Sequence, residues 1–142
     1  MQYRSNSEQD TKKISQKIAA SLQGGDIVLL YGELGAGKSA FTRGVAEYFN
    51  INKNVTSPTF TLMNVYPTEH PTIKRLVHVD TYRLEDEQQL IEIGAEDYLG
   101  APDTVCFVEW PEKLLILLEN KKTISIKIVS QGKNQRQIIV SE

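Results

Sequence analysis

The sequence predicts a three-layer α/β fold in which a parallel core sheet carries antiparallel additions, within a single domain of residues 1–142. Two short apolar runs, 26–31 and 103–108, have the length and composition of strands that are buried on both faces, as in a parallel sheet. Segments with helical periodicity lie between these runs. Two further pairs of runs are typical of antiparallel hairpins: 57–66 with 73–80, and 123–129 with 136–140.

The first predicted helix covers 10–22 and follows Ser7-Glu8-Gln9-Asp10, which resembles an N-terminal capping box. Ile18 and Leu22 recur at the four-residue spacing of one helix face, and Gly24-Gly25 would end the helix before the first buried strand. The remaining segments that we expect to contain helical turns are 39–49, 86–93, 96–99 and 111–118.

The loop after the first buried strand is Gly32-Glu33-Leu34-Gly35-Ala36-Gly37-Lys38-Ser39, which fits the phosphate-binding pattern G-x-x-x-x-G-K-[ST]. Its glycines let several backbone N–H groups converge on a phosphate, and the N-terminus of the following helix favours the same anion. Lys38 would bind the β- and γ-phosphates, and the hydroxyl of Ser39 would bind Mg²⁺. The motif therefore predicts a P-loop NTPase fold that binds a nucleoside triphosphate with Mg²⁺. The nucleotide contacts expected from this segment are Glu33, Leu34, Gly35, Ala36, Gly37, Lys38, Ser39 and Ala40.

Two carboxylates follow apolar strands. Glu109 follows 105–108 as the acidic residue of a Walker B element follows its strand, and it is predicted to hold Mg²⁺ together with Ser39. Asp80 ends the apolar run 76–79 and is predicted to orient the attacking water or a metal-bound water. The alternatives are a solvated strand-end glutamate and an N-cap aspartate for the next helix. Lys38, Asp80 and Glu109 are thus the predicted catalytic residues.

Composition sets bounds on function. Sixteen basic and eighteen acidic residues give a net charge of −2, which does not favour binding of nucleic acid by bulk electrostatics. Cys106, the one cysteine, lies in an apolar strand-like run, where a buried inert thiol is expected. We expect no membrane association, because no apolar run is long enough to span a bilayer and no signal peptide is evident, and the cytoplasm is the default location.

Four segments, in this order and spacing, closely resemble the TsaE family, which is also called YjeE: 32–39, 57–60, 78–84 and 108–111. The resemblance covers nearly the whole chain and implies an ATPase of tRNA modification. That family supports formation of N6-threonylcarbamoyladenosine at position 37 of tRNAs that read codons starting with A. It works in a complex with TsaD and TsaB, after TsaC makes threonylcarbamoyl-AMP, so tRNA would be met indirectly through the complex.

The segment around 57–61 falls where a P-loop NTPase places a switch, and Ser57, Thr59 and Thr61 are candidates to sense the γ-phosphate through Mg²⁺. Tyr82 and Arg83 are further switch candidates. Arg83 could pair with Asp80 or a phosphate, or make a surface salt bridge. A proline-kinked entry into a strand is the alternative for the first segment.

The resemblance places Trp110 beside the nucleotide, although a residue that closes the strand against the core would look the same. It also aligns Thr11 with a residue beside the adenine and Arg136 with a nucleotide-contacting arginine, and both positions could equally be surface residues. His78 alternates with valines and is expected to be structural rather than catalytic.

The leading hypothesis is a slow ATPase that partner proteins activate. A small-molecule kinase is the alternative, but it would need an acceptor pocket and an arginine-bearing lid, and neither is evident. A GTPase-like switch is rejected because Asn120-Lys121-Lys122-Thr123 lacks the carboxylate that reads guanine. A scaffold that holds nucleotide without hydrolysis is the fourth hypothesis.

Overall fold

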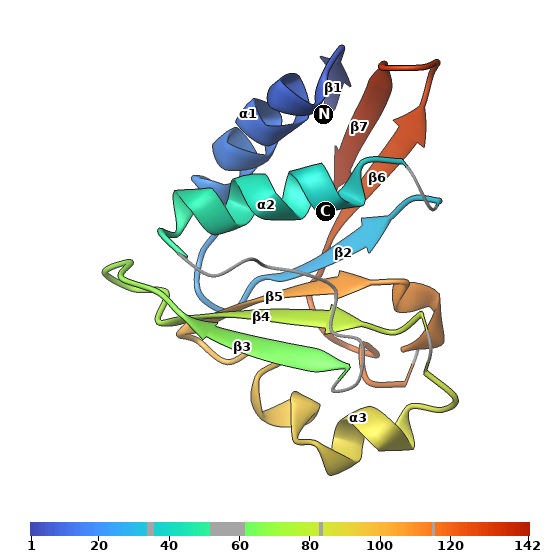
Figure 1. Ribbon diagram of the computed structural model, residues 1–142. Coiled ribbons are helices and arrows are strands. Elements are labelled where there is room, and N and C mark those ends of the chain that lie inside the picture. The colour runs from blue at the N-terminus through green and yellow to red at the C-terminus, as the bar shows by residue number, and fades with distance from the viewer. Residues whose placement is uncertain (34–35, 52–61, 83, 115) are drawn as a thin grey trace.

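The computed structural model describes residues 1–142 apart from 34–35, 52–61, 83 and 115. Among the described residues, seven strands form one mixed sheet in the order β1-β7-β6-β2-β5-β4-β3 (Figure 1). The middle strands β4, β5, β2 and β6 run parallel, whereas β3, β7 and β1 pair antiparallel at the two sides. The predicted fold class is therefore confirmed. The strands are β1 Gln2–Ser5, β2 Ile27–Tyr31, β3 Met63–Pro67, β4 Arg75–Asp80, β5 Thr104–Glu109, β6 Ile124–Ser130 and β7 Arg136–Ser141.

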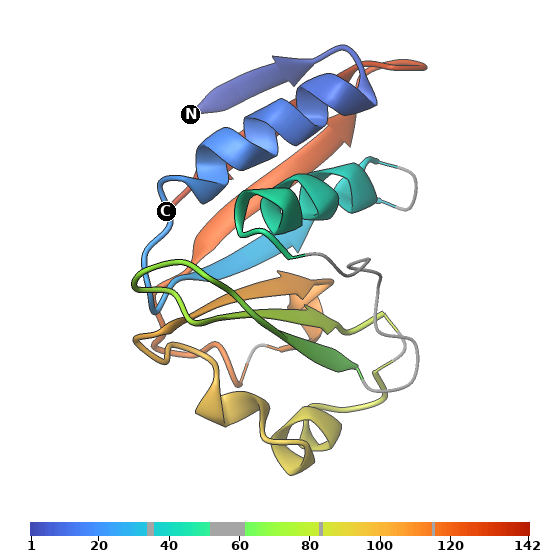
Figure 2. The same ribbon diagram turned by 60° about the vertical axis from the view of Figure 1, so that its left-hand side comes forward.

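Helices cover the two faces of the sheet unequally (Figures 1 and 2). The long helices α1 (Glu8–Ala19) and α2 (Lys38–Tyr48) lie on one face, and α3 (Gln88–Glu92) lies on the other with the 3₁₀ helices η1 (Ala95–Asp97) and η2 (Pro111–Lys113). Alternation along β5 divides the core accordingly. Val105 and Phe107 belong to the cluster beneath α1 and α2, and Cys106 and Val108 belong to the opposite cluster.

The first helix begins two residues earlier than the predicted 10–22 and ends earlier as well, at Ala19. Its cap is the predicted one, because the Ser7 side chain accepts a hydrogen bond of 3.0 Å from the Asp10 backbone N–H. Leu22 lies beyond the helix and is nevertheless buried in the core. The turn that follows α1 thus still delivers an apolar side chain to the face that the periodicity indicated.

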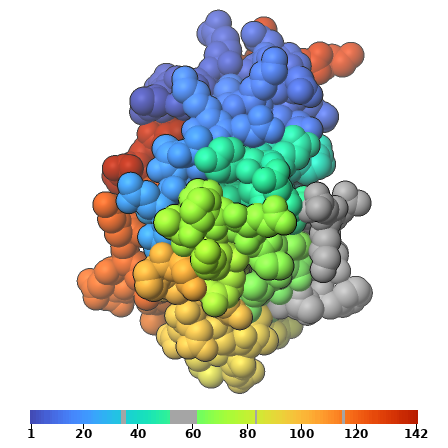
Figure 3. All heavy atoms as spheres, turned by 90° about the vertical axis from the view of Figure 1, so that its left-hand side faces the viewer, coloured from blue at the N-terminus to red at the C-terminus, as the bar shows by residue number. Residues whose placement is uncertain are grey.

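Close packing of α1 on α2 holds the middle and the last turn of α2 in place. Gly44 provides the contact, because a Cβ there would lie 1.8 Å from Ser15 Oγ and 2.8 Å from the Lys12 carbonyl oxygen. Lys12 Nζ also lies 2.6 Å from a carboxylate oxygen of Glu47 on α2. Directly after α2, the ring of Phe49 packs on His70 with centroids 5.8 Å apart, where the tip of the β3–β4 hairpin meets the helix (Figure 3).

The strands of both hairpins pair as the sequence predicts, and the sheet contains one further strand, β1, that was not predicted. β3 pairs with β4 and β6 pairs with β7, as expected, although residues 57–61 of the first predicted strand lie outside the described residues. β1 was not predicted, since Gln2–Ser5 is short and mostly polar and shows no apolar alternation. It forms because β7 presents an open edge, and Gln2 pairs there with Ile139.

Candidate nucleotide site

The two predicted carboxylates lie side by side at the carboxyl edge of the parallel strands. Asp80 is the last residue of β4 and Glu109 the last of β5, and the two are direct partners in the parallel register. Glu109 is also in register with Leu30 of β2, the strand that leads into the P-loop. The β4, β5 and P-loop ends therefore converge at one edge, where ligands of open α/β sheets bind.

A cavity of about 500 Å³ opens at this edge. It is lined by most of the predicted site residues: Thr11, Gly37, Lys38, Ser39, Ala40, Asp80, Tyr82, Glu109, Trp110 and Arg136. Two others, Glu33 and Ala36, line a neighbouring cavity of about 580 Å³, which Trp110 also borders. The candidates Leu34, Gly35, Ser57, Thr59, Thr61 and Arg83 lie outside the described residues.

Lys38 lies at the start of α2, directly after Gly37, whose φ of 104° is in the left-handed region. Its side chain is largely buried, and Nζ sits 4.0 Å from the centroid of the Trp110 ring. An ammonium over an indole face is attracted by the ring quadrupole. The Lys38 charge is therefore held at the wall of the cavity by an aromatic partner.

Trp110 adopts an uncommon backbone conformation for a bulky residue, with φ 58° and ψ 52°. Thr81, the residue directly after β4, holds it in place: its hydroxyl donates to the Glu109 carbonyl at 3.0 Å and also contacts the Trp110 carbonyl oxygen. The Tyr82 ring packs on the indole with centroids 5.2 Å apart. Such strain costs on the order of 1–3 kcal/mol and is concentrated at functional sites.

Asp80 is partly buried and accepts a hydrogen bond of 3.0 Å through Oδ1 from the Tyr82 backbone N–H. The next helix, α3, begins only at Gln88 with Glu87 at its N-cap. Asp80 therefore does not cap that helix, and its local bond orients the carboxylate at the strand end. Lys113 fixes the same turn by donating from Nζ to the Tyr82 carbonyl oxygen at 2.7 Å.

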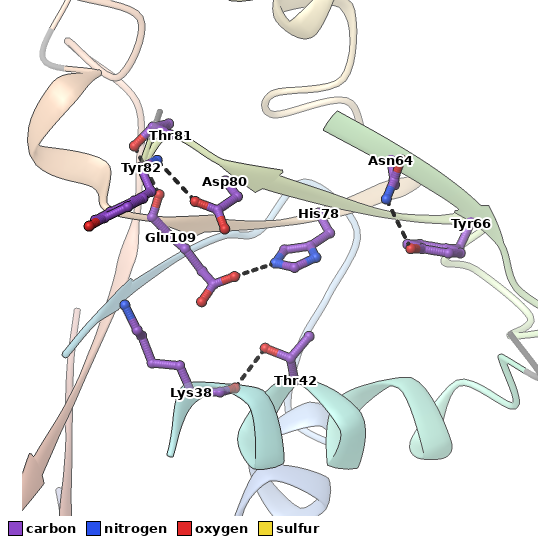
Figure 4. A network of polar contacts seen from close by, with 9 residues as sticks. All are labelled: Lys38, Thr42, Asn64, Tyr66, His78, Asp80, Thr81, Tyr82 and Glu109. Atoms are coloured by element: carbon purple, nitrogen blue, oxygen red, sulfur yellow. Dashed lines mark hydrogen bonds and ion pairs between the residues drawn. The ribbon is translucent and has the colours of Figure 1, made fainter. Parts of the chain in front are cut away.

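Glu109 is buried, and Figure 4 shows its side chain between the sheet and α2. Its Oε2 lies 2.7 Å from Nε2 of His78, which is buried as well. A buried carboxylate is unfavourable without a hydrogen-bonded partner, and His78 supplies one. The structural role predicted for His78 did not include this partner.

Arg136 and Thr11 connect distant segments to the rim of the cavity. Arg136, at the start of β7, donates from Nε to the Ala36 carbonyl oxygen at 2.9 Å, so the last hairpin holds the P-loop. Thr11 is buried, and its hydroxyl lies 2.7 Å from Ser5 Oγ. Both residues border the cavity and both have bonds that order its wall.

Five lining residues were missed by the sequence analysis: Ser7, Glu8, Arg43, Lys133 and Asn134. Arg43 follows Ser39 by four residues on α2, so helical spacing places the two on one face. Lys133 lies in the turn of the hairpin that carries Arg136, and a nearby pair of basic residues was the available signal. With these additions, basic side chains outnumber acidic ones by one in the cavity wall. This small excess of positive charge suits an anion that binds together with a metal cation.

The predicted metal ligands Ser39 and Glu109 line the same cavity. Within the described part of the chain, no group of three or more His, Cys, Asp or Glu residues is arranged to hold a metal ion. Mg²⁺ bound with a nucleotide needs only one or two protein oxygens, because phosphates and water supply the others. A hydroxyl at a helix start and a buried carboxylate at a strand end fit that requirement.

Cys106 lies apart from the cavity, in the middle of β5 on the opposite face of the sheet. It is fully buried, and burial raises the pKa of its thiol to about 12. The expectation of an inert thiol agrees with this environment.

Among the described helices, none has the length and apolar character needed to cross a bilayer.

Comparison with known proteins gives a consistent family. The family model described as "Threonylcarbamoyl adenosine biosynthesis protein TsaE" matches residues 5–138. Proteins named tRNA threonylcarbamoyladenosine biosynthesis protein TsaE from Bacillus subtilis and Treponema pallidum are 36% and 37% identical to the chain; the alignments cover 97% and 96% of it, and 83% and 97% of the relatives. The crystal structure of Bacillus subtilis YdiB superposes with a TM-score of 0.71 at 30% identity, covering 97% of this chain and 82% of that one.

Proposed function

Because the chain belongs to the TsaE family of threonylcarbamoyladenosine biosynthesis, we propose that it is a P-loop ATPase of this tRNA modification. It binds ATP with Mg²⁺ and hydrolyses the nucleotide slowly until partner proteins complete the site. The observation that carries the proposal is one cavity that joins the P-loop lysine to two strand-end carboxylates, an indole and basic side chains of the last hairpin.

In this proposal each of these cavity residues has a separate role. Lys38 exchanges its contact with Trp110 for the β- and γ-phosphates, and Arg136 keeps the P-loop carbonyl of Ala36 turned away from them. Ser39 and Glu109 hold Mg²⁺, which neutralises charge on the phosphates when bound. Asp80, whose carboxylate is oriented by the Tyr82 N–H, positions the attacking water.

Partner proteins enter the proposal through the family. We propose TsaD and TsaB as the partners, with tRNA reached through their complex, and the cytoplasm as the compartment because tRNAs are used there. The open cavity suits this proposal, since a partner could complete its outer wall. Hydrolysis by the assembled complex is expected to exceed hydrolysis by the isolated chain.

The experiment that tests nucleotide binding is Lys38→Ala, measured by ATP titration and by Tm. We expect affinity to fall below detection while Tm stays near wild type, because the ammonium contacts the cavity wall rather than the apolar core. Arg43→Ala is a matched control on the next turn of α2 and should weaken binding only slightly. Unchanged affinity in Lys38→Ala would contradict the proposal, and transfer of labelled phosphate from ATP to an organic acceptor would favour a small-molecule kinase.

A further inference from the structure

We propose that His78 is a positioning residue for Glu109: its Nε2–H holds one carboxylate oxygen, so that the other oxygen is presented to Mg²⁺. The inference rests on the proposed function, in which Glu109 binds the metal. It assigns His78 a role that neither the P-loop motif nor the strand-end carboxylates imply.

The contact is a diagonal pair across two parallel strands. Glu109 is in register with Asp80, and His78 lies two residues before Asp80 on the same face of β4. The Glu109 side chain therefore folds back along the sheet toward the interior to place Oε2 at 2.7 Å from His78 Nε2 (Figure 4). Without a partner there, a carboxylate at a strand end would extend toward the solvent of the cavity.

The surroundings of His78 favour this role over a packing role. The ring lies on the α2 face of β4, two residues after the core residue Leu76 and in register with Phe107, where an apolar side chain would pack at least as well. Within the described part of the chain, its Nδ1 is buried and has no hydrogen-bond partner. A neutral ring with hydrogen on Nε2 leaves only a lone pair at Nδ1, so the bond to Glu109 is made without burying an orphan N–H donor.

The carboxylate that His78 holds faces the start of α2. In Figure 4 the second oxygen of Glu109 points to the side of Lys38 and Thr42. Thr42 donates to the Lys38 carbonyl oxygen at 2.9 Å, so the opposing wall is ordered as well. Outer partners of metal ligands fix ligand orientation, and their loss typically lowers metal affinity or activity about 10- to 100-fold.

The test compares His78→Leu with His78→Gln. Leu keeps the apolar volume and removes the donor, whereas the amide nitrogen of Gln stands the same number of bonds from the backbone as Nε2. The measurement is the Mg²⁺ concentration that half-maximally enhances ATP binding, together with ATP affinity without metal. We expect His78→Leu to raise that Mg²⁺ concentration about 10- to 100-fold, with little change in metal-free binding and substantial rescue by His78→Gln.

Two controls separate positioning from damage to the fold. His70→Leu changes the only other histidine of the chain, in the β3–β4 turn, and should leave the Mg²⁺ dependence unchanged. In a Glu109→Gln background, His78→Leu should have much less effect, because the group that it positions is already altered. An equal effect of His78→Leu in both backgrounds would overturn the proposal.

A direct readout needs no nucleotide. With ¹⁵N-labelled histidine, the two rings are assigned by comparison with the His70 variant, and we expect His78 to carry its proton on Nε2. The opposite tautomer would overturn the proposal, because the bond to the carboxylate needs that proton. Absence of Mg²⁺-dependent ATP binding in the wild-type chain would overturn the proposed function itself, whereas normal Mg²⁺ dependence in His78→Leu overturns only the role of His78.

Discussion

The two ends of the β4–β5 strand pair carry similar polar contacts in opposite surroundings. At the amino ends, Arg75 Nη1 lies 2.8 Å from Asp103 Oδ1, with the side chains 40% and 42% exposed. At the carboxyl ends, His78 Nε2 lies 2.7 Å from Glu109 Oε2, with the side chains 3% and 8% exposed. Water screens the first pair, whereas removal of one partner from the second leaves a buried group unsatisfied. Two ion pairs with nearly the same N–O distance therefore contribute differently, because one is exposed and the other is buried.

This difference agrees with the proposed function, which lies at the carboxyl ends of the strands, and leaves the amino ends with contacts that only stabilise the fold. At the amino ends the charged side chains of Arg75 and Asp103 stay solvated. The carboxyl ends bury polar groups beside a cavity, which is favourable only if those groups act on a ligand or hold one another. Substitutions at the carboxyl ends should change chemistry, and substitutions at the amino ends should change stability.

The largest expected effect is on turnover in Asp80→Asn. The change keeps the size of the side chain and removes the charge that we propose positions water, so we expect the single-turnover rate with the proposed partners TsaB and TsaD to fall about 10²- to 10⁴-fold. ATP affinity should change little, because positioning of water acts mainly in the transition state. Asp103→Asn, the same change at the amino ends, should leave the rate unchanged. A collapse of affinity at a normal saturated rate would make Asp80 a binding residue.

The next effect is on the thiol midway between the two ends. Burial raises the Cys106 pKa to about 12 from its ordinary value of 9.0, so its thiolate fraction at pH 8 should be about 10³-fold below that of an exposed cysteine. Labelling of the native protein by iodoacetamide should be slower by at least this factor and should become rapid in denaturant. Rapid labelling of the native chain would show that β5 opens more readily than its burial indicates.

The raised pKa of Cys106 also means that its neutral thiol favours the folded state below about pH 9, and that this contribution to stability is lost as the pH rises toward 12.

A smaller effect is expected from Gly24→Ala at the amino edge of the sheet. A Cβ at Gly24 would lie 1.9 Å from the Pro102 carbonyl oxygen, so the backbone must move. We expect a loss of unfolding free energy of about 1–3 kcal/mol, measured by urea denaturation, with ATP affinity of the folded protein unchanged. The exposed neighbour provides the control, since Gln23→Ala should be nearly neutral. A selective loss of ATP affinity would contradict the division between the two ends.

The smallest effect is expected from the exposed pair. Hydrogen bonds from Thr104 and Arg75 lower the pKa of Asp103 below its ordinary 3.8. Because the folded pKa is the lower one, the contribution is present above pH 3.8 and is lost as the pH falls through the folded value. Asp103→Asn should lower Tm slightly at pH 7, and the difference from wild type should shrink near pH 2. A large change in Tm would show that exposure does not weaken this pair.

Local patterns predicted much of the fold and the identity of most cavity residues. The apolar runs before Asp80 and Glu109 indicated buried strands, and parallel packing then brought both carboxylates to one edge. Glycine and hydroxyl positions around Lys38 likewise predicted the helix start, because each follows from a short stretch of sequence.

Contacts that depend on register could not be predicted in this way. The His78–Glu109 bond requires the alignment of β4 with β5, and the bond from Arg136 to Ala36 joins residues 100 positions apart. β1 has no pattern of its own and exists because β7 offers it an edge. The conformation of Trp110 is also set by Thr81, directly after β4, rather than by its own preference.

The strand order also determines when the protein can fold during its synthesis. β2 lies between β5 and β6, so the central strand gains its second parallel neighbour only after Ile124–Ser130 has left the ribosome. β1 can pair even later, because its partner β7 is the last strand to be synthesised. Early-made segments must therefore stay unaggregated until late-made ones arrive, and the loop-closure entropy of these non-local pairings predicts folding on a timescale of about milliseconds to seconds.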